Sequence, residues 1–385
     1  MAKFNRREKI LIIGNGFDLA HGLPTAYKDF MQFCNVVQTI LLDKECTSIS
    51  DAIENADIHS KIKAVIESEL NDDAGILENK TISMFQELNV CIQENIWYTY
   101  FEKIKGKMQG DNWIDFESEI SEVIEYLDRK IDRLEKKYKR SDFINVINDR
   151  DPRGKITGFF VTIFPDQLLS LFGREIRERC FNDLEKLTRA LEIYLSSFVE
   201  KIDCDELNII SEIQPDYVIS FNYTDTYKKI YGIKEEKPEI FHIHGKCDAG
   251  NPMKENNMVL GIDEYWEGKD KDIHTNFSIF KKFVQRIRKK TGAGIYTVLK
   301  TIENTHEVSN YKMPIYVFGH SLDKTDKDIL SRFLGHKATK IKVYCKDKGS
   351  EGELIAKMIQ LIGQDNLVDK VYANPSKLDF EVIEK

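Results

Sequence analysis

The sequence predicts an α/β fold: a doubly wound, mostly parallel sheet with a large helical insertion. Three observations lead to this prediction. A β-branched apolar run, Ile10–Ile13, passes directly into the loop Gly14-Asn15-Gly16. All other strand-like runs follow Pro215. The roughly 200 residues between them have helical periodicity, so an open sheet interrupted after its first strand and helix is the economical architecture.

The predicted strands are short, apolar and rich in β-branched residues, which is typical of buried parallel strands. The first is Lys9–Ile13. The later ones are Tyr217–Ser220, Glu239–His244, Met258–Leu260, Ile315–Phe318, Ile341–Cys345 and Lys370–Ala373.

Two long amphipathic helices are predicted within the interrupting segment, because apolar residues recur there at steps of three or four. The first helix carries Trp113, Phe116, Ile120, Val123, Leu127, Ile131, Leu134 and Tyr138. The second carries Leu168, Phe172, Ile176, Cys180, Leu184, Leu187, Leu191, Leu195 and Phe198. A loop is expected between them at Asp151–Ile156. We therefore expect a nucleotide-binding domain formed by residues 1–30 and 215–385, and a helical insertion subdomain at 31–214.

Composition favours a globular, cytoplasmic protein. The chain has 385 residues with 42% hydrophobic and 31% charged side chains, which argues against wholesale disorder. Its net charge of −8 argues against a protein that coats nucleic acid. Apolar runs are too short for a signal peptide or a membrane helix, so we expect no membrane partner. The seven cysteines form no CxxC pair, so neither a disulfide framework nor a zinc ribbon is expected.

The loop that begins at Gly14 is a candidate phosphate site, because glycine lets backbone N–H groups approach an anion closely. It is not the usual dinucleotide fingerprint, since Leu19 stands where the third glycine belongs. A hydride-transferring dehydrogenase is therefore disfavoured. No GK[ST] follows, so the loop is not a P-loop either. Taken alone, it is more simply a plain connection between a strand and a helix.

Three further segments carry polar residues near predicted strand ends, where ligands of open α/β sheets bind. In SFNYT, Asn222 is suited to orient a water or a ribose hydroxyl, or to cap the next helix. In FHIHG, His244 is the candidate general base, whereas a core role is preferred for His242 and a metal site is disfavoured. In YVFGHSL, Gly319 and Ser321 are placed to hold a phosphate or ribose. Asp323 and Asp326 then begin the next helix.

Together and in this order, these segments resemble the sirtuin-type NAD-binding fold. The variants present resemble the AbiH family of bacterial phage abortive-infection proteins, from residue 9 to about residue 330. The family's features are GNGFDLAHGLPTAYKDF, WIDFE at Trp113–Glu117, SFNYT, HIHG and FGHSLDKTD.

The resemblance implies that NAD is bound and hydrolysed to nicotinamide and ADP-ribose, without a metal. It implies catalytic roles for Asn222, His244 and Asp18. It implies contacts to NAD from Gly14, Asn15, Gly16, Phe17, Gly22, Pro24, Thr25, Tyr27, Gly319 and Ser321. Asp18 replaces a sirtuin serine, and either stabilises positive charge at the ribose or repels a pyrophosphate. The sirtuin zinc module is missing from the sequence, so deacetylation is disfavoured.

Two other functions stay open. One is a non-catalytic sensor of NAD or ADP-ribose in phage defence. The other is an RNA-directed toxin, suggested by the basic residues Lys281, Lys282, Arg286, Arg288, Lys289 and Lys290. The helical insertion is the expected place for control by a phage-derived trigger or for an interface between copies of the chain.

Overall fold

The computed structural model describes residues 8–42, 53–72, 80–105, 115–134, 173–232, 237–266, 268–270, 274–303 and 313–383. The chain divides into two compact units. The sheet unit comprises Met1–Thr25, Val199–Cys247 and Arg286–Lys385. The helical unit comprises Ala26–Phe198 and Asp248–Gln285.

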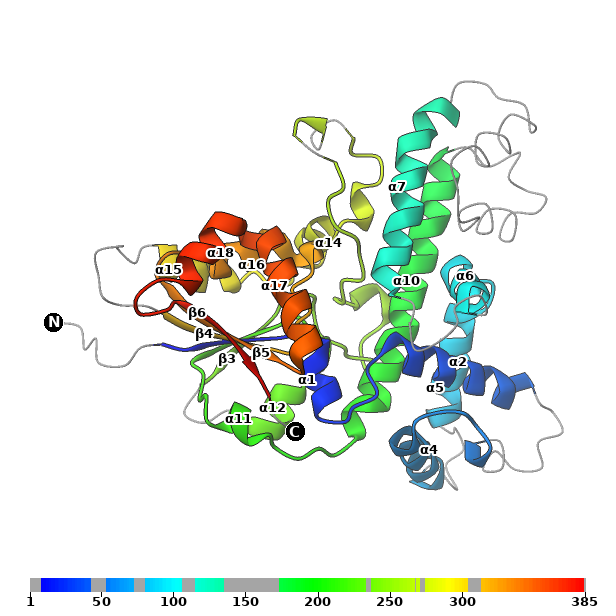
Figure 1. The fold of residues 1–385 in the computed structure, drawn as a ribbon. Coiled ribbons are helices and arrows are strands. Elements are labelled where there is room, and N and C mark those ends of the chain that lie inside the picture. Colours follow the sequence, from blue (N-terminus) through cyan, green and yellow to red (C-terminus); the bar gives the residue numbers. More distant parts are fainter. Residues whose placement is uncertain are drawn as a thin grey trace. The chain divides into compact units, whose positions relative to one another are not determined.

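A six-stranded, all-parallel sheet forms the centre of the sheet unit (Figure 1). The strand order is β3-β2-β1-β4-β5-β6. The central strand β1 pairs with β2 on one side, where Ile10 faces Tyr217, and with β4 on the other, where Ile10 faces Ile315. The strands are β1 (Ile10–Ile13), β2 (Tyr217–Ser220), β3 (Glu239–His242), β4 (Met313–Phe318), β5 (Thr339–Cys345) and β6 (Leu378–Val382). The prediction of an α/β fold with a parallel sheet is confirmed.

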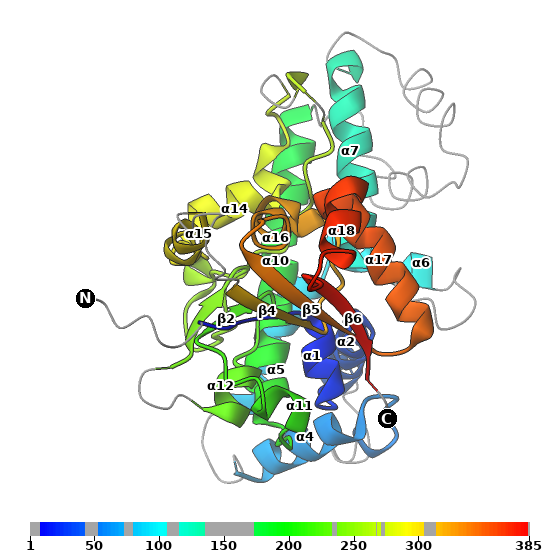
Figure 2. The ribbon, with the colours of Figure 1, turned by 60° about the vertical axis from the view of Figure 1, so that its left-hand side comes forward.

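Helices flank both faces of this sheet, because successive strand residues point to opposite sides and both sides are apolar (Figure 2). Ile10 and Ile12 belong to one core, and Leu11 and Ile13 to the other. The first core is covered by α15 (Ile295–Glu303), α16 (Lys327–Leu334), α17 (Lys348–Ile362) and α18 (Gln364–Val371). The second is covered by α1 (Asn15–Ala20), α11 (Asn208–Ser211) and α12 (Thr226–Tyr231).

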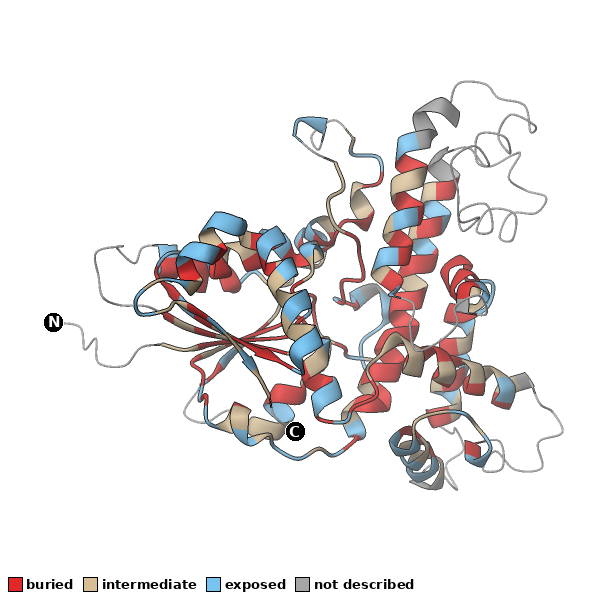
Figure 3. Cartoon of the chain, viewed as in Figure 1, coloured by how far each residue is buried: buried red, intermediate tan, exposed pale blue. Residues whose placement is uncertain are grey.

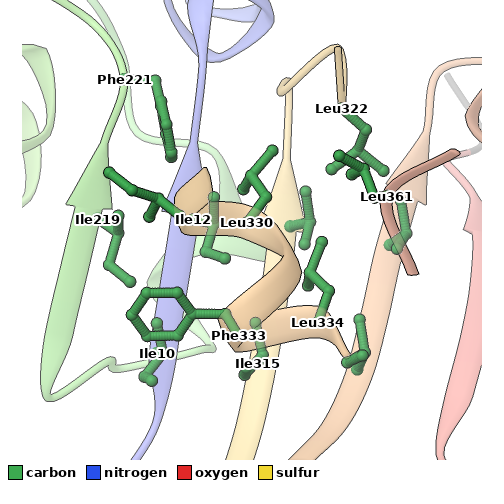
Figure 4. Close-up of a cluster of buried hydrophobic side chains, with 14 of the residues drawn as sticks. Ile10, Ile12, Ile219, Phe221, Ile315, Leu322, Leu330, Phe333, Leu334 and Leu361 are labelled. Carbon is green, nitrogen blue, oxygen red and sulfur yellow. The ribbon is translucent and has the colours of Figure 1, made fainter. Parts of the chain in front are cut away.

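The first core is the larger one (Figure 4). Leu330, Phe333 and Leu334 of α16 lie over the strands against Ile12 and Ile315 (Figure 4). All of these side chains are at most 1% exposed, and the inner strands of the sheet are drawn largely as buried in Figure 3. This packing holds α16 against the sheet.

Two of the predicted strands are wrong and one ends early. Met258–Leu260 is buried but forms no strand, because side chains satisfy its backbone: Asn256 accepts from the Met258 amide and Gln285 donates to the Leu260 carbonyl. Lys370–Ala373 begins as the last turn of α18, and the sixth strand, β6, follows it instead. The predicted strand Glu239–His244 ends at His242.

The helical unit confirms both predicted long helices. In α7 (Phe116–Leu134) the apolar face is buried from Phe116 to Leu127, and in α10 (Gly173–Ser197) from Ile176 to Leu195. Trp113, Tyr138, Leu168, Phe172 and the expected loop Asp151–Ile156 lie outside the described residues. Around α10 pack α2 (Tyr27–Leu42), α5 (Lys80–Ile92) and α6 (Ile96–Lys105), while α4 (Ser60–Asp72) contacts α5.

Short elements complete the described chain: η1 (Val199–Lys201), η2 (Met253–Glu255), η3 (Ser278–Phe280), α14 (Lys282–Lys289) and η4 (Lys324–Asp326). Among the described residues, no helix has the length and apolar character that crossing a membrane requires.

Candidate active site

The candidate site lies at the carboxyl edge of the sheet, where the loops after β1, β2, β3 and β4 meet. In a parallel sheet these loops all emerge at the same edge. They carry Asp18, Asn222, His244 and Gly319, which are far apart in the sequence. The strand order reverses between β1 and β4, so the first and fourth loops diverge from a common point.

The glycines of the first and fourth loops let two backbones touch. The Gly16 amide donates to the Gly319 carbonyl at 2.7 Å. A Cβ on Gly319, which has a φ of +65°, would lie 2.1 Å from the Phe17 nitrogen. A Cβ on Gly14 would lie 2.8 Å from the His320 Cα. Close packing of the two loops therefore accounts for these glycines, and the Gly16 amide is already used within the protein.

Asp18 is a buried carboxyl group held by side chains from the second loop. It lies in α1 and is 1% exposed. Its Oδ1 accepts from Asn222 Nδ2 at 3.0 Å, and its Oδ2 accepts from Thr224 Oγ1 at 2.5 Å. Burial raises the pKa of Asp18 to about 6, although hydrogen bonds from Thr224, Thr226 and Asn222 oppose the rise. This carboxyl therefore changes its charge close to neutral pH.

The side-chain oxygen of Asn222 is a buried acceptor beside this carboxyl. Asn222 is 5% exposed, and its Oδ1 has no hydrogen-bond donor among the residues that the structure describes. Its Nδ2 is committed to Asp18, and its backbone carbonyl lies 3.2 Å from His242 Nδ1. Buried acceptors normally have donors, so this position suits a hydroxyl group or water that is not part of the chain.

His244 forms a pair with Asp326 from the fourth loop. His244 Nε2 lies 2.8 Å from Asp326 Oδ1, and both residues are buried. Asp326 Oδ2 lies 3.8 Å from Nε2 of His320, whose Nδ1 accepts from the Leu322 amide. The ring of Phe221 packs against both histidines, at centroid distances of 5.4 and 4.4 Å. A histidine oriented by a carboxylate is a suitable general base.

The other predicted contact residues are distributed unevenly. Asn15, Gly22 and Ser321 are exposed, Thr25 is half-buried and Pro24 is buried. Phe17 is 0% exposed, and its ring packs in the second core against His21 and Tyr227. Tyr27 belongs to the helical unit, where it stacks on Phe116 with ring centroids 4.1 Å apart. The ring of Phe17 therefore belongs to the second core, and Tyr27 packs within the helical unit.

Sequence reasoning missed Thr224 and assigned Asp326 only to the start of a helix. Asp326 does occupy the position before α16, but its side chain makes no capping hydrogen bond and instead contacts His244, 82 positions away in the sequence. Asp323 instead caps η4, by accepting from the Thr325 amide. No local pattern distinguishes these two aspartates.

Three of the six basic residues that suggested RNA binding are buried and form ion pairs. Lys281 pairs with Glu264 at 2.8 Å, and Lys282 pairs with Glu117 at 2.9 Å. Both lysines are at most 3% exposed. Arg286 is also buried and pairs with Asp328. Half of the six basic side chains are therefore unavailable as an exposed cationic face.

Comparison with known proteins identifies a family. The family model described as "Bacteriophage abortive infection AbiH" matches residues 10–345. No curated protein and no solved structure matches the chain.

Proposed function

The chain belongs to the AbiH family of bacteriophage abortive infection proteins, and we propose that it acts in abortive infection by hydrolysing NAD to nicotinamide and ADP-ribose. The observation that carries this proposal is the buried Asp18 carboxyl, held by Asn222 and Thr224 at the edge of the sheet. Depletion of NAD would stop metabolism in the infected cell, and the phage with it.

The strand order supports a dinucleotide as the ligand. The order β3-β2-β1-β4-β5-β6 is that of sheets that bind dinucleotides in the crevice where the strand order reverses. That point lies between β1 and β4, whose loops carry Asp18 and Asp326. That the sheet is related to those of Rossmann and sirtuin proteins is also proposed, on the basis of this strand order.

The chemistry requires a buried negative charge. When the bond between the nicotinamide nitrogen and ribose C1′ breaks, its electron pair leaves with nicotinamide, and positive charge develops on the ribose ring. An ionised Asp18 in a dry site would stabilise that charge more strongly than water does, because the local dielectric is low. A neutral side chain of the same shape would not.

The reaction also requires a base and a place for the nucleophile. Water attacks C1′, and His244 takes the proton that this water releases. Asp326, 2.8 Å from His244 Nε2, stabilises the imidazolium ion that results. The unpartnered Oδ1 of Asn222 is suited to accept a hydrogen bond from the ribose or from the water.

The test is NAD consumption by the purified full chain and by cells during phage challenge, with nicotinamide and ADP-ribose quantified. Wild type is compared with Asn222→Ala, His244→Ala and a control, His336→Ala. The control removes a histidine from the turn before β5, where its Nδ1 accepts from the Ala338 amide. We expect product in wild type and the control, and a loss of at least about 100-fold in the two site variants.

Intact NAD in both settings, with the protein still protecting cells, would overturn the hydrolase proposal. Saturable binding of NAD or ADP-ribose under those conditions would favour the sensor function instead. Turnover that survives in both site variants would place the chemistry elsewhere in the chain.

A further inference from the structure

Arg286 is a buried cation whose hydrogen-bonding capacity is incompletely used. It lies in α14, belongs to the sheet unit and is 8% exposed. Its Nη2 bonds to Asp328 Oδ2. Its Nη1 is buried and has no acceptor among the described residues. Leaving a charged donor buried and unpartnered is unfavourable, so such a group normally has an acceptor in the functional state.

The position of Arg286 connects it to the candidate active site. Its partner Asp328 lies in the first turn of α16. Asp326, immediately before that helix, contacts His244. The guanidinium group and the His244–Asp326 pair are therefore held by the same helix start.

A second link ties the end of α14 to Ile243, the residue that precedes His244. The Thr291 amide donates to the Arg286 carbonyl at 3.1 Å. Thr291 Oγ1 donates to the Ile243 carbonyl at 3.2 Å. Arg286 and His244 are thus fixed relative to one another from two sides.

The glycine loop leaves the anion-binding role open. A dinucleotide carries two negative phosphates, and the expected donor, the Gly16 amide, is bound to the Gly319 carbonyl. A guanidinium N–H is a stronger donor to phosphate than a neutral amide, because the hydrogen bond is charge-assisted.

We propose that Arg286 Nη1 binds a phosphate oxygen of the ligand, so that the diphosphate lies at the start of α16 rather than on the glycine loop. The proposal rests on the proposed function only for naming the ligand as a dinucleotide. The anion site itself depends on Arg286 and its surroundings, whether or not the ligand is cleaved.

The test is the affinity of the full chain for ADP-ribose and for inorganic pyrophosphate, measured by calorimetry at low ionic strength. Arg286→Met is compared with Arg332→Met. Arg332 lies on α16, and its replacement removes an equal charge from a half-exposed ion pair with Glu303 of α15. We expect Arg286→Met to weaken both ligands by about 10- to 100-fold, as for one lost charge-assisted hydrogen bond. Arg332→Met should leave both affinities within about 2-fold.

A gain-of-affinity variant separates this effect from misfolding. Asp328→Asn removes the carboxylate that partly neutralises Arg286, so pyrophosphate and ADP-ribose should bind about 2- to 5-fold more tightly. A damaged fold would not bind them better.

Three results would overturn the anion site: wild type that binds neither ligand, equal affinities in wild type and Arg286→Met, or equal losses in both arginine variants. NAD hydrolysis with unchanged affinity in Arg286→Met would refute this inference and leave the proposed function standing. Binding that depends on Arg286, with no NAD hydrolysis, would support the anion site and refute the proposed function.

Discussion

Replacing Asp18 by asparagine should stabilise the sheet unit at neutral pH while abolishing activity. The pKa of Asp18 is raised from 3.8 to about 6 by burial, so the folded state binds this proton more tightly than the unfolded state. The carboxyl therefore contributes most to stability below about pH 4, and that contribution is lost as pH rises to about 6. Above pH 6 the ionised group costs about 3 kcal/mol, at about 1.4 kcal/mol per pKa unit.

Asparagine keeps the shape of the side chain and does not titrate. It can still accept from Asn222, and its own N–H can donate to Thr224 Oγ1, which also accepts from Thr226, once the Thr224 hydroxyl proton turns away from residue 18. The free energy of unfolding of Asp18→Asn, minus that of wild type, should therefore rise between pH 4 and 6 and level near about 3 kcal/mol.

The assay is urea unfolding at pH 4.5 and pH 8, followed by far-UV circular dichroism. Tryptophan fluorescence is unsuitable, because all three tryptophans fall in the sequence ranges of the helical unit. Asp347→Asn is the control. Hydrogen bonds from the backbone and the side chain of Ser350 lower the pKa of Asp347, so its pH window lies below 3.8. Its stability difference should stay constant across the same range. A constant difference for Asp18→Asn as well would refute the reasoning.

Three further predictions concern activity and packing. NAD hydrolysis should fall as pH drops through about 6, because protonation removes the Asp18 charge; a rate that is flat from pH 8 to pH 5 would contradict this role. Gly319→Ala should cost about 3 kcal/mol or more in urea unfolding, since its Cβ would overlap the neighbouring loop at a φ of +65°, whereas Gly352→Ala, inside α17 with no atom within 4 Å of the new Cβ, should stabilise by up to about 1 kcal/mol. Phe333→Ala should cost about 3–5 kcal/mol through a core cavity, whereas Val368→Ala, 43% exposed, should change stability by less than about 0.5 kcal/mol in the same assay.

Strands in the centre of the sheet could be predicted because their sequences are apolar on both faces. Tyr217–Ser220 has the bounds of β2, and Ile341–Cys345 lies within β5. The edge strand β6 was missed because Leu378, Phe380 and Val382 alternate with acidic residues, so the segment has no continuous apolar run like those of the central strands. The segment Lys370–Ala373 was misread because Val371 and Tyr372 favour a strand, although Asn374-Pro375 after it mark a helix end. Lys370 is buried in α18, where its Nζ donates to the His336 carbonyl at 2.7 Å.

The candidate site could be predicted only in part. Asn222 and His244 stand beside recognisable strand ends, so the sequence places them at the sheet edge. Asp18 and Thr224, which form a hydrogen bond, are 206 positions apart in the sequence. Hydrophobic periodicity predicts local structure and cannot predict a contact between such distant residues. The buried state of Arg286 was hidden for a related reason: its neighbours Arg288 and Lys290 are exposed, and a basic run looks the same whether its members face water or a protein interior.

The place of β1 in the sheet has a consequence for synthesis on the ribosome. Its four residues are buried between β2 and β4, and the partners of Ile10 are Tyr217 and Ile315. At about 5–20 residues per second, the first strand waits on the order of 15–60 s for β4 to be made. Asp18 likewise precedes Asp326 by most of the chain. A nascent or truncated chain without β4 therefore lacks the complete constellation, so we expect an unfinished copy of the protein to be inactive.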